Sequence, residues 1–221
     1  MLVGYTVTVK HIGKTLNQAI DLIRIPIKTA IIQLAVVVNK ISGGRITPSS
    51  ITLTGFSLHI LIAVLIATRH NIWAGILLLI FGLFDALDGA LARLQKTDGP
   101  KGMLLDSITD RMKEVILYTG AAYAISVTHS PQVVPWAVAA CGASLLVSYV
   151  NAWGEVVIGS SHSTDHTTNR SFRSGVMTFE IRMFFMFIGL LSDQILPTVI
   201  FLSIASTLTA LGRMRSIMQK L

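Results

Sequence analysis

The sequence predicts an all-α membrane protein with six transmembrane helices, preceded by an amphipathic helix at the membrane surface. Three observations support this fold class. Of the 221 residues, 52% are hydrophobic and 13% are charged, whereas about a quarter of the residues are charged in a soluble domain. Long apolar runs recur along the chain, each near the ~20 residues that cross a hydrocarbon core. The basic residues, finally, lie almost entirely on one side of the spans that these runs define.

Residues 12–42 differ in periodicity from the rest of the chain. Their apolar positions recur at steps of three and four residues and are Leu16, Ile20, Ile23, Ile27, Ile31 and Leu34. This stripe is typical of an amphipathic helix at the cytoplasmic membrane surface, kinked or restarted at Pro26. We therefore divide the chain into an interfacial segment over residues 1–45 and a six-span domain over residues 46–221.

The six spans are expected at apolar runs separated by polar or turn-forming segments. The runs cover residues 51–68, 71–92, 103–128, 132–158, 175–191 and 193–212. Residues 42–48 form a turn before the first run, and Ser49 or Ser50 can cap its helix. The segment Asp98-Gly99-Pro100 breaks the chain between the second and third runs, and a polar loop over residues 160–173 separates the fourth from the fifth.

The distribution of charge predicts the orientation in the membrane. If the N-terminus is cytoplasmic, seventeen of the eighteen Lys and Arg residues fall on the cytoplasmic face and only Arg69 on the other. This asymmetry indicates an inner- or plasma-membrane protein with both termini in the cytoplasm. The net charge of +7 could suggest that the protein binds nucleic acid. Because the basic residues gather on one face of the membrane, we instead expect them to attract anionic lipid headgroups. We expect no cleaved signal peptide, and the single cysteine, Cys141, excludes an intrachain disulfide.

Four aspartates interrupt the second and third apolar runs. Carboxylates inside a bilayer are costly and therefore indicate a functional site. Asp85 and Asp88 share one helix face, as do Asp106 and Asp110. Because a short break joins the two helices as a hairpin, we expect the two pairs to face each other near the cytoplasmic ends. A divalent cation would relieve their mutual repulsion, and an all-carboxylate set suits Mg²⁺ or Mn²⁺.

Small residues and an arginine accompany the aspartates. Gly89, Ala92 and Gly102 allow the backbone to approach a bulky ligand closely. The planar guanidinium of Arg93 suits a phosphate or a diphosphate. Together with an acid-bound metal, these residues predict a pocket for a metal-bound diphosphate within reach of lipid. The chemistry that such a pocket supports is phosphoryl or prenyl transfer.

The spacing D-x2-D-G-x2-A-R-x8-G-x3-D-x3-D over residues 85–110 resembles, in every element, the motif of the CDP-alcohol phosphatidyltransferase family. The resemblance implies phospholipid biosynthesis: a phosphatidyl group passes from a CDP-linked lipid, CDP-diacylglycerol, to a small polar alcohol, and CMP is released. It further implies two Mg²⁺ or Mn²⁺ ions and a homodimer. The metal ligands that it implies are Asp85, Asp88 and Asp106, with Asp110 as general base and a further metal contact. The CDP-site residues that it implies are Asp88, Gly89, Ala92, Arg93 and Gly102.

Residues 47–55 also resemble the start of the family's first span. The family often has Thr-Pro-Asn at this point, and Ser49 stands here in place of the asparagine. Within this segment Thr52 and Thr54 are candidates to hydrogen-bond the nucleotide.

The acceptor is less clearly specified than the donor. Residues 148–155 resemble a segment that often reads Tyr-x-Lys-Ala-Arg in inositol-phosphate and archaeal lipid synthases, but Asn151 and Trp153 stand at the two basic positions. The candidate acceptor-binding residues are Asn151, Arg170, Arg173 and Arg182. Glu155 and Glu180 either pair with Arg182 or help to hold the acceptor. Whether the acceptor carries a phosphate therefore stays open.

Three other interpretations compete with this one. An intramembrane prenyltransferase also binds a diphosphate through aspartates and Mg²⁺, but its motif lacks the element Gly89-x2-Ala92-Arg93. A cation transporter would hold its ion near the bilayer midplane, often within repeated halves, and no repeat is visible in the sequence. In a purely structural interpretation, the aspartates only pair with Arg93, Arg111 and Lys113 at helix ends.

Overall fold

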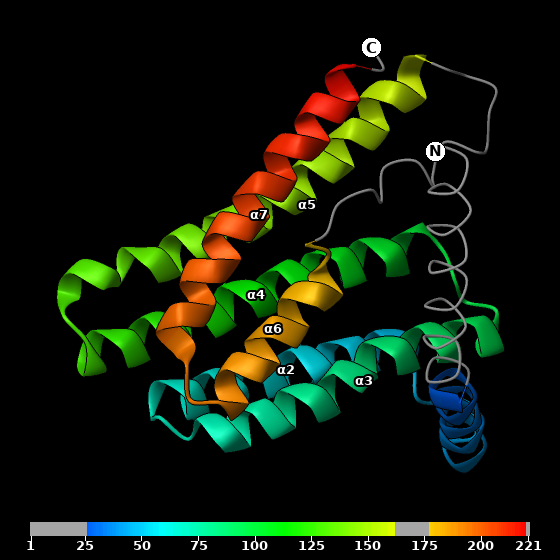
Figure 1. The fold of residues 1–221 in the computed structure, drawn as a ribbon. Coiled ribbons are helices and arrows are strands. Elements are labelled where there is room, and N and C mark those ends of the chain that lie inside the picture. Colours follow the sequence, from blue (N-terminus) through cyan, green and yellow to red (C-terminus); the bar gives the residue numbers. More distant parts are fainter. Residues whose placement is uncertain (1–25, 162–176, 220–221) are drawn as a thin grey trace, which may run out of the picture.

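The computed structural model describes residues 26–161 and 177–219, and this part of the chain is helical without strands. A helix over residues 26–41 comes first. It is followed by α2 (Pro48–Ala67), α3 (Asn71–Gln95), α4 (Pro100–Thr128), the 3-10 turn η1 (Pro131–Val133), α5 (Pro135–Ser161), α6 (Phe179–Leu191) and α7 (Ile195–Met218) (Figure 1). The predicted all-α class is confirmed.

Four of these helices, α2, α3, α5 and α7, are long and apolar enough to cross a membrane. The two others differ from them for separate reasons. Helix α4 has 29 residues but carries five charged side chains between residues 106 and 114, and α6 has 13 residues. The structure therefore supports a membrane protein with four candidate spans among the described residues.

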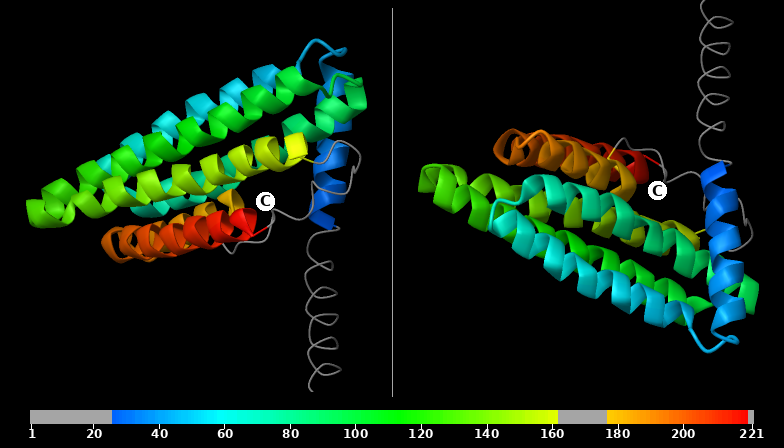
Figure 2. Two further views of the ribbon diagram at one scale, coloured as in Figure 1. Left: turned by 90° about the horizontal axis from the view of Figure 1, so that it is seen from above. Right: turned by 90° about the horizontal axis from the view of Figure 1, so that it is seen from below.

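The helices that carry the aspartates are held together by a third helix. Helix α2 packs against both α3 and α4, α6 contacts α3 and α7, and α5 packs along α7 (Figures 1 and 2). A short turn joins α3 to α4, as the sequence predicts, yet these two helices hardly contact each other. Their aspartates therefore approach through side chains rather than through close packing of the two backbones.

The N-terminal helix lies across one end of the bundle (Figure 2). Its Ile31 and Ala35 pack against apolar side chains from the beginning of α2 and the end of α3, and these are Ile51, Phe84, Leu87, Ala90 and Leu91. Ile27 and Leu34, which belong to the predicted apolar stripe, are about half exposed, at 48% and 49%. The remaining stripe positions Leu16, Ile20 and Ile23 lie outside the described residues, so the amphipathic helix stays a prediction over that part.

The beginning of α2 corrects one detail of the sequence analysis. Thr47, and not Ser49 or Ser50, is the N-cap residue, and its hydroxyl accepts a hydrogen bond of 3.2 Å from the backbone N–H of Ser50. The reason is Pro48, whose fixed φ suits the first helical position and lets the helix begin there. The predicted break before the third span is present: α3 ends at Gln95, its C-cap residue Lys96 is in the left-handed conformation with φ 54°, and α4 begins at Pro100.

The contact between α2 and α4 depends on Gly120. A Cβ atom at this position would lie 2.5 Å from the carbonyl oxygen of Ala63 and 3.1 Å from its Cα. Both are backbone atoms, so they cannot move aside without moving α2. Close approach through small residues is typical of helix packing in membranes.

We therefore expect Gly120→Ala to separate α2 from α4 and to lower the free energy of unfolding by about 1–3 kcal/mol, the usual cost of overpacking. The measurement is the thermal midpoint of unfolding in detergent. Gly142→Ala is the matched control, because a Cβ there meets nothing within 4 Å and alanine is the better helix former. Equal midpoints for both variants would contradict the prediction.

Candidate active site

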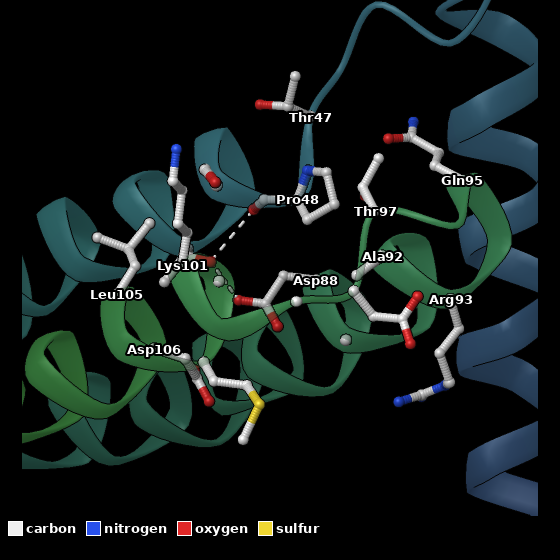
Figure 3. Close-up of a pocket in the computed structure, with 17 residues that line it drawn as sticks. Thr47, Pro48, Asp88, Ala92, Arg93, Gln95, Thr97, Lys101, Leu105 and Asp106 are labelled. Atoms are coloured by element: carbon white, nitrogen blue, oxygen red, sulfur yellow. Dashed lines mark hydrogen bonds between the residues drawn. The ribbon is translucent and has the colours of Figure 1, made fainter.

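A cavity of about 490 Å³ lies where α2 begins, α3 ends and α4 begins (Figure 3). Seven predicted site residues from all three helices line it: Thr52, Asp88, Gly89, Ala92, Arg93, Gly102 and Asp106. Three others, Thr54, Asp85 and Asp110, do not. The sequence analysis did not single out Thr47, Gln95, Thr97 or Lys101, which also line the cavity. Thr47 could have been predicted to lie at the site, because it belongs to residues 47–55, which resemble the start of the family's first span.

Two buried polar side chains meet at the wall of the cavity. The hydroxyl oxygen of Thr52 lies 2.6 Å from Oδ2 of Asp88 and 3.1 Å from the carbonyl oxygen of Pro48 (Figure 3). Thr52 thus donates to an aspartate, a contact that the sequence analysis did not predict. Thr54, by contrast, is exposed and donates to the carbonyl oxygen of Ser50.

A lysine joins the first and fourth aspartates. The Lys113 side chain is 0% exposed, and its ammonium contacts Oδ1 of Asp85 and lies 3.2 Å from Oδ1 of Asp110. Arg111 Nη1 lies 3.5 Å from the other oxygen of Asp110. The aspartates therefore form two sets: Asp85 and Asp110 contact Lys113, whereas Asp88 and Asp106 line the cavity. The spacing of Asp110 and Lys113, three residues apart on a helix, was the signal for this contact.

The residues at the cavity suit a hard divalent cation. Among the described residues, no three His, Cys, Asp or Glu side chains form a ready ligand set, and Lys113 lies between two of the four aspartates. Asp88 and Asp106, however, offer carboxylate oxygens to the cavity, and neither forms an ion pair within the described chain. With the hydroxyl of Thr52 beside them, the donors are all oxygen, which fits Mg²⁺ or Mn²⁺.

Arg182 lies in the protein core and not at the cavity. Its side chain is 1% exposed; Nε and Nη2 donate to the two carboxylate oxygens of Glu114 at 2.7 and 2.9 Å, and Nη1 donates to the carbonyl oxygen of Met177 at 2.8 Å. The partner is therefore Glu114, a residue that the sequence analysis missed, and not Glu155 or Glu180. This ion pair connects Arg182 on α6 to Glu114 on α4, and Glu114 is the residue that follows Lys113.

The other candidate acceptor residues are not brought to the cavity either. Asn151 lines a separate hollow of about 670 Å³ between α4 and α5, to which Arg111 and Tyr149 also contribute. Its amide donates to Oε1 of Glu155 at 3.2 Å. Arg170 and Arg173 lie outside the described residues.

Together, the helices and the cavity define an integral membrane protein that presents carboxylates, a guanidinium and small residues to one shared ligand site. A family model described as CDP-alcohol phosphatidyltransferase matches residues 45–211, well over half of the chain. The chain belongs to the CDP-alcohol phosphatidyltransferase family, and the family predicted from the aspartate motif is confirmed.

The curated relatives carry related names. The phosphatidylinositol phosphate synthase of Corynebacterium glutamicum is 35% identical over 114 residues, which make up 50% of this chain and 52% of that protein. The archaetidylinositol phosphate synthase of Pyrococcus horikoshii is 38% identical over 77 residues, 35% of this chain and 41% of that protein. The chain thus spans about half the length, or less, of these relatives.

Solved structures share the fold. Phosphatidylinositol phosphate synthase of Mycobacterium tuberculosis with CDP-DAG bound has a TM-score of 0.71 and 20% identity, and the match covers 85% of this chain and 92% of that one. The same synthase in complex with manganese and citrate has a TM-score of 0.72 at 20% identity, covering 85% and 88%.

Proposed function

We propose that this protein is an enzyme of phospholipid biosynthesis that transfers a phosphatidyl group from CDP-diacylglycerol to the hydroxyl of a polar alcohol and releases CMP. One observation carries the proposal: motif residues from two consecutive helices, α3 and α4, line one cavity. Membership of the family and the CDP-DAG bound to a protein of the same fold support the choice of donor.

In this proposal, the nucleotide half of the donor occupies the cavity. Gly89 and Ala92 leave room for it, since neither has a bulky side chain. The Arg93 guanidinium, which also lines the cavity, carries the charge and the planar shape that suit a diphosphate. The lipid chains then extend toward the membrane along the apolar faces of the helices.

Asp85, Asp88 and Asp106 are the proposed metal ligands, and a manganese complex of a protein with the same fold supports Mn²⁺ or Mg²⁺. When bound, the metal neutralises charge that develops on the CMP leaving group. Thr52 fixes the carboxylate of Asp88 from the side of α2, which holds one ligand in place before the metal arrives.

Asp110 is the proposed general base. It takes the proton of the acceptor hydroxyl; the acceptor oxygen then forms a bond to the lipid-side phosphorus, and the bond from that phosphorus to CMP breaks. Asp110 lies four residues after Asp106 and so on the same face of α4. Lys113 and Arg111 contact its two oxygens and hold the carboxylate in position.

The acceptor is a polar alcohol, and the names of the curated relatives put phosphorylated inositol first among the candidates. Asn151, Arg170, Arg173 and Arg182 stay the proposed acceptor contacts. Of these, Arg182 would reach an acceptor only if its guanidinium left Glu114.

We further propose the topology that the distribution of basic residues predicts. Helices α4 and α6 join the four candidate spans, so that six helices cross the membrane and both termini and the site face the cytoplasm. The two fully buried charges of α4, Lys113 and Glu114, are compatible with this position because Asp85 and Arg182 pair with them. The division into an interfacial segment over residues 1–45 and a domain over residues 46–221, and a homodimer, complete the proposal.

The test is an acceptor screen. Purified protein with CDP-diacylglycerol and Mn²⁺ is expected to release CMP only when the correct acceptor is present. Inositol 1-phosphate comes first, followed by glycerol 3-phosphate, serine and phosphatidylglycerol. Failure to release CMP with all of them would contradict the proposal, and metal-dependent ion flux into liposomes without CMP release would favour a transporter instead.

A further inference from the structure

A polar cavity of about 300 Å³ lies at the other end of α2 and α3 from the candidate active site. The turn between α2 and α3, the end of α4 and the turn between α6 and α7 form it (Figure 1). The polar side chains that line this far cavity are Arg69, Asn71, Thr128, His129, Asp193 and Gln194.

The length of α3 places the far cavity in the membrane. The helix has 25 residues, and at ~1.5 Å per residue it separates the two cavities by about 35 Å. The hydrocarbon core of a bilayer is ~30 Å thick. In the proposed topology, the far cavity therefore lies among the headgroups of the leaflet opposite the active site.

Two side chains of opposite charge line the far cavity without pairing with each other. Arg69 and Asp193 are both exposed, and neither forms an ion pair with any group in the described part of the chain. Both residues have left-handed backbone conformations, with φ 65° and 56°, which cost free energy in residues other than glycine. The two turns thus hold a positive and a negative charge at one cavity and leave both available to a ligand.

A buried side chain of the far cavity lacks a partner. Asn71, the first residue of α3, is 6% exposed, and its amide nitrogen donates to Oδ1 of Asp193 at 2.5 Å. Because a carboxylate only accepts hydrogen bonds, this contact determines which way the amide points. The amide oxygen is buried and has no hydrogen-bond partner among the described residues, which is costly unless a donor reaches it. The cavity therefore needs a hydrogen-bond donor close to the carboxylate of Asp193.

The same cavity suits an anion at another part of its wall. Helices α3 and α7 both begin at it, with Asn71 and Ile195, and neither helix has a hydrogen bond from its N-cap side chain. The first-turn N–H groups and the helix dipole at such a terminus favour a phosphate. The guanidinium of Arg69 adds a charge and a shape that suit the same group.

We propose that the far cavity binds the ethanolamine phosphate headgroup of a phospholipid from the leaflet opposite the active site. The ammonium of the headgroup donates to Asp193 and to the amide oxygen of Asn71, and the phosphate lies toward Arg69 and the two helix termini. A metal cation alone would be repelled by Arg69, and an anion alone by Asp193, whereas a zwitterion satisfies both. The inference uses the proposed topology but not the proposed reaction.

The test measures lipid binding to the purified, delipidated protein by native mass spectrometry, with excess CDP-diacylglycerol present to occupy the candidate active site. It compares phosphatidylethanolamine with phosphatidylcholine of identical acyl chains, because choline carries the positive charge but has no N–H to donate. The wild-type protein is expected to bind phosphatidylethanolamine about tenfold more tightly or better, which corresponds to a hydrogen bond with a charged group. Soluble phosphoethanolamine is the third ligand, and binding as tight as that of the lipid would overturn the assignment to a lipid.

Two variants separate the two halves of the headgroup. Asp193→Asn can still accept the hydrogen bond from Asn71, and asparagine tolerates the left-handed conformation, so this variant should fold and lose most of the preference for ethanolamine. Arg69→Gln removes a phosphate contact and should weaken binding of both lipids while the preference stays. Gln132→Ala is the matched control and should behave as wild type, because Gln132 is exposed after the end of α4 and does not line the cavity.

Equal affinity of the wild-type protein for the two lipids would overturn the inference, and this result needs no variant. An unchanged preference in Asp193→Asn would overturn it as well. The outcome is independent of catalysis: a protein that prefers phosphatidylethanolamine but releases no CMP in the acceptor screen would support the lipid site and contradict the proposed function.

Discussion

Replacing Asp110 with asparagine is expected to lower turnover by about 10²–10⁴-fold, the usual contribution of a general base, while binding of the CDP-linked lipid stays near the wild-type level. The amide has the shape of the carboxylate, and its oxygen can still accept the hydrogen bond from Lys113. It cannot take up the proton of the acceptor hydroxyl. The measurements are the rate of CMP release with saturating acceptor and the affinity for CDP-diacylglycerol.

Asp88→Asn is the matched variant, since it makes the same chemical change on the neighbouring helix. Asp88 lines the cavity, so its replacement is expected to weaken binding of the CDP-linked lipid and of metal. An equal loss of donor binding in the two variants would show that Asp88 and Asp110 do not have separate roles.

Arg182→Met is expected to have the largest effect on stability. It removes the only ion-pair partner that Glu114 has in the described chain and leaves a carboxylate with 0% exposure inside the helix bundle. Breaking a buried pair in this way costs about 3–5 kcal/mol. For a chain of this size, that corresponds to a decrease of about 6–20 °C in the thermal midpoint of unfolding in detergent.

Two further variants separate this structural role from the proposed contact with the acceptor. The double variant Glu114→Gln/Arg182→Met removes both charges and should recover part of the lost stability. Arg182→Lys keeps one charge but loses the two-pronged geometry, so its midpoint should lie between those of wild type and Arg182→Met. An unchanged midpoint in Arg182→Met with a raised KM for the acceptor would instead support the acceptor role.

Local rules predicted much of the fold. The break at Asp98-Gly99-Pro100 separates α3 from α4 because proline and glycine act on the backbone wherever they occur. The six apolar runs also correspond to helices α2 to α7, with small differences in where each helix begins and ends. The motif residues at the cavity also followed from spacing along two helices, since a helical period determines which side chains share a face.

The features that the sequence did not reveal depend on pairs of residues that are distant along the chain. Glu114 and Arg182 are 68 residues apart, and no periodicity links α4 to α6. Thr52 stays a predicted nucleotide contact, but its hydrogen bond to Asp88 could not be predicted, because nothing in its own segment indicates that a residue 36 positions later lies beside it. Lys113 was visible only as one of several basic residues near the aspartates, and its burial could not be read from its neighbours in sequence.

The pairing of Glu114 with Arg182 also has a consequence for biogenesis. Helix α4 contains five charged residues between positions 106 and 114, each of which is costly in lipid on its own. Lys113 pairs with Asp85, which lies on the preceding helix α3 and is therefore synthesised earlier. Arg182, the partner of Glu114, is synthesised only after α5. In the proposed topology, we therefore expect α4 to enter the bilayer next to α2, against which it packs, and to become stably inserted only once α6 has left the ribosome and joined it.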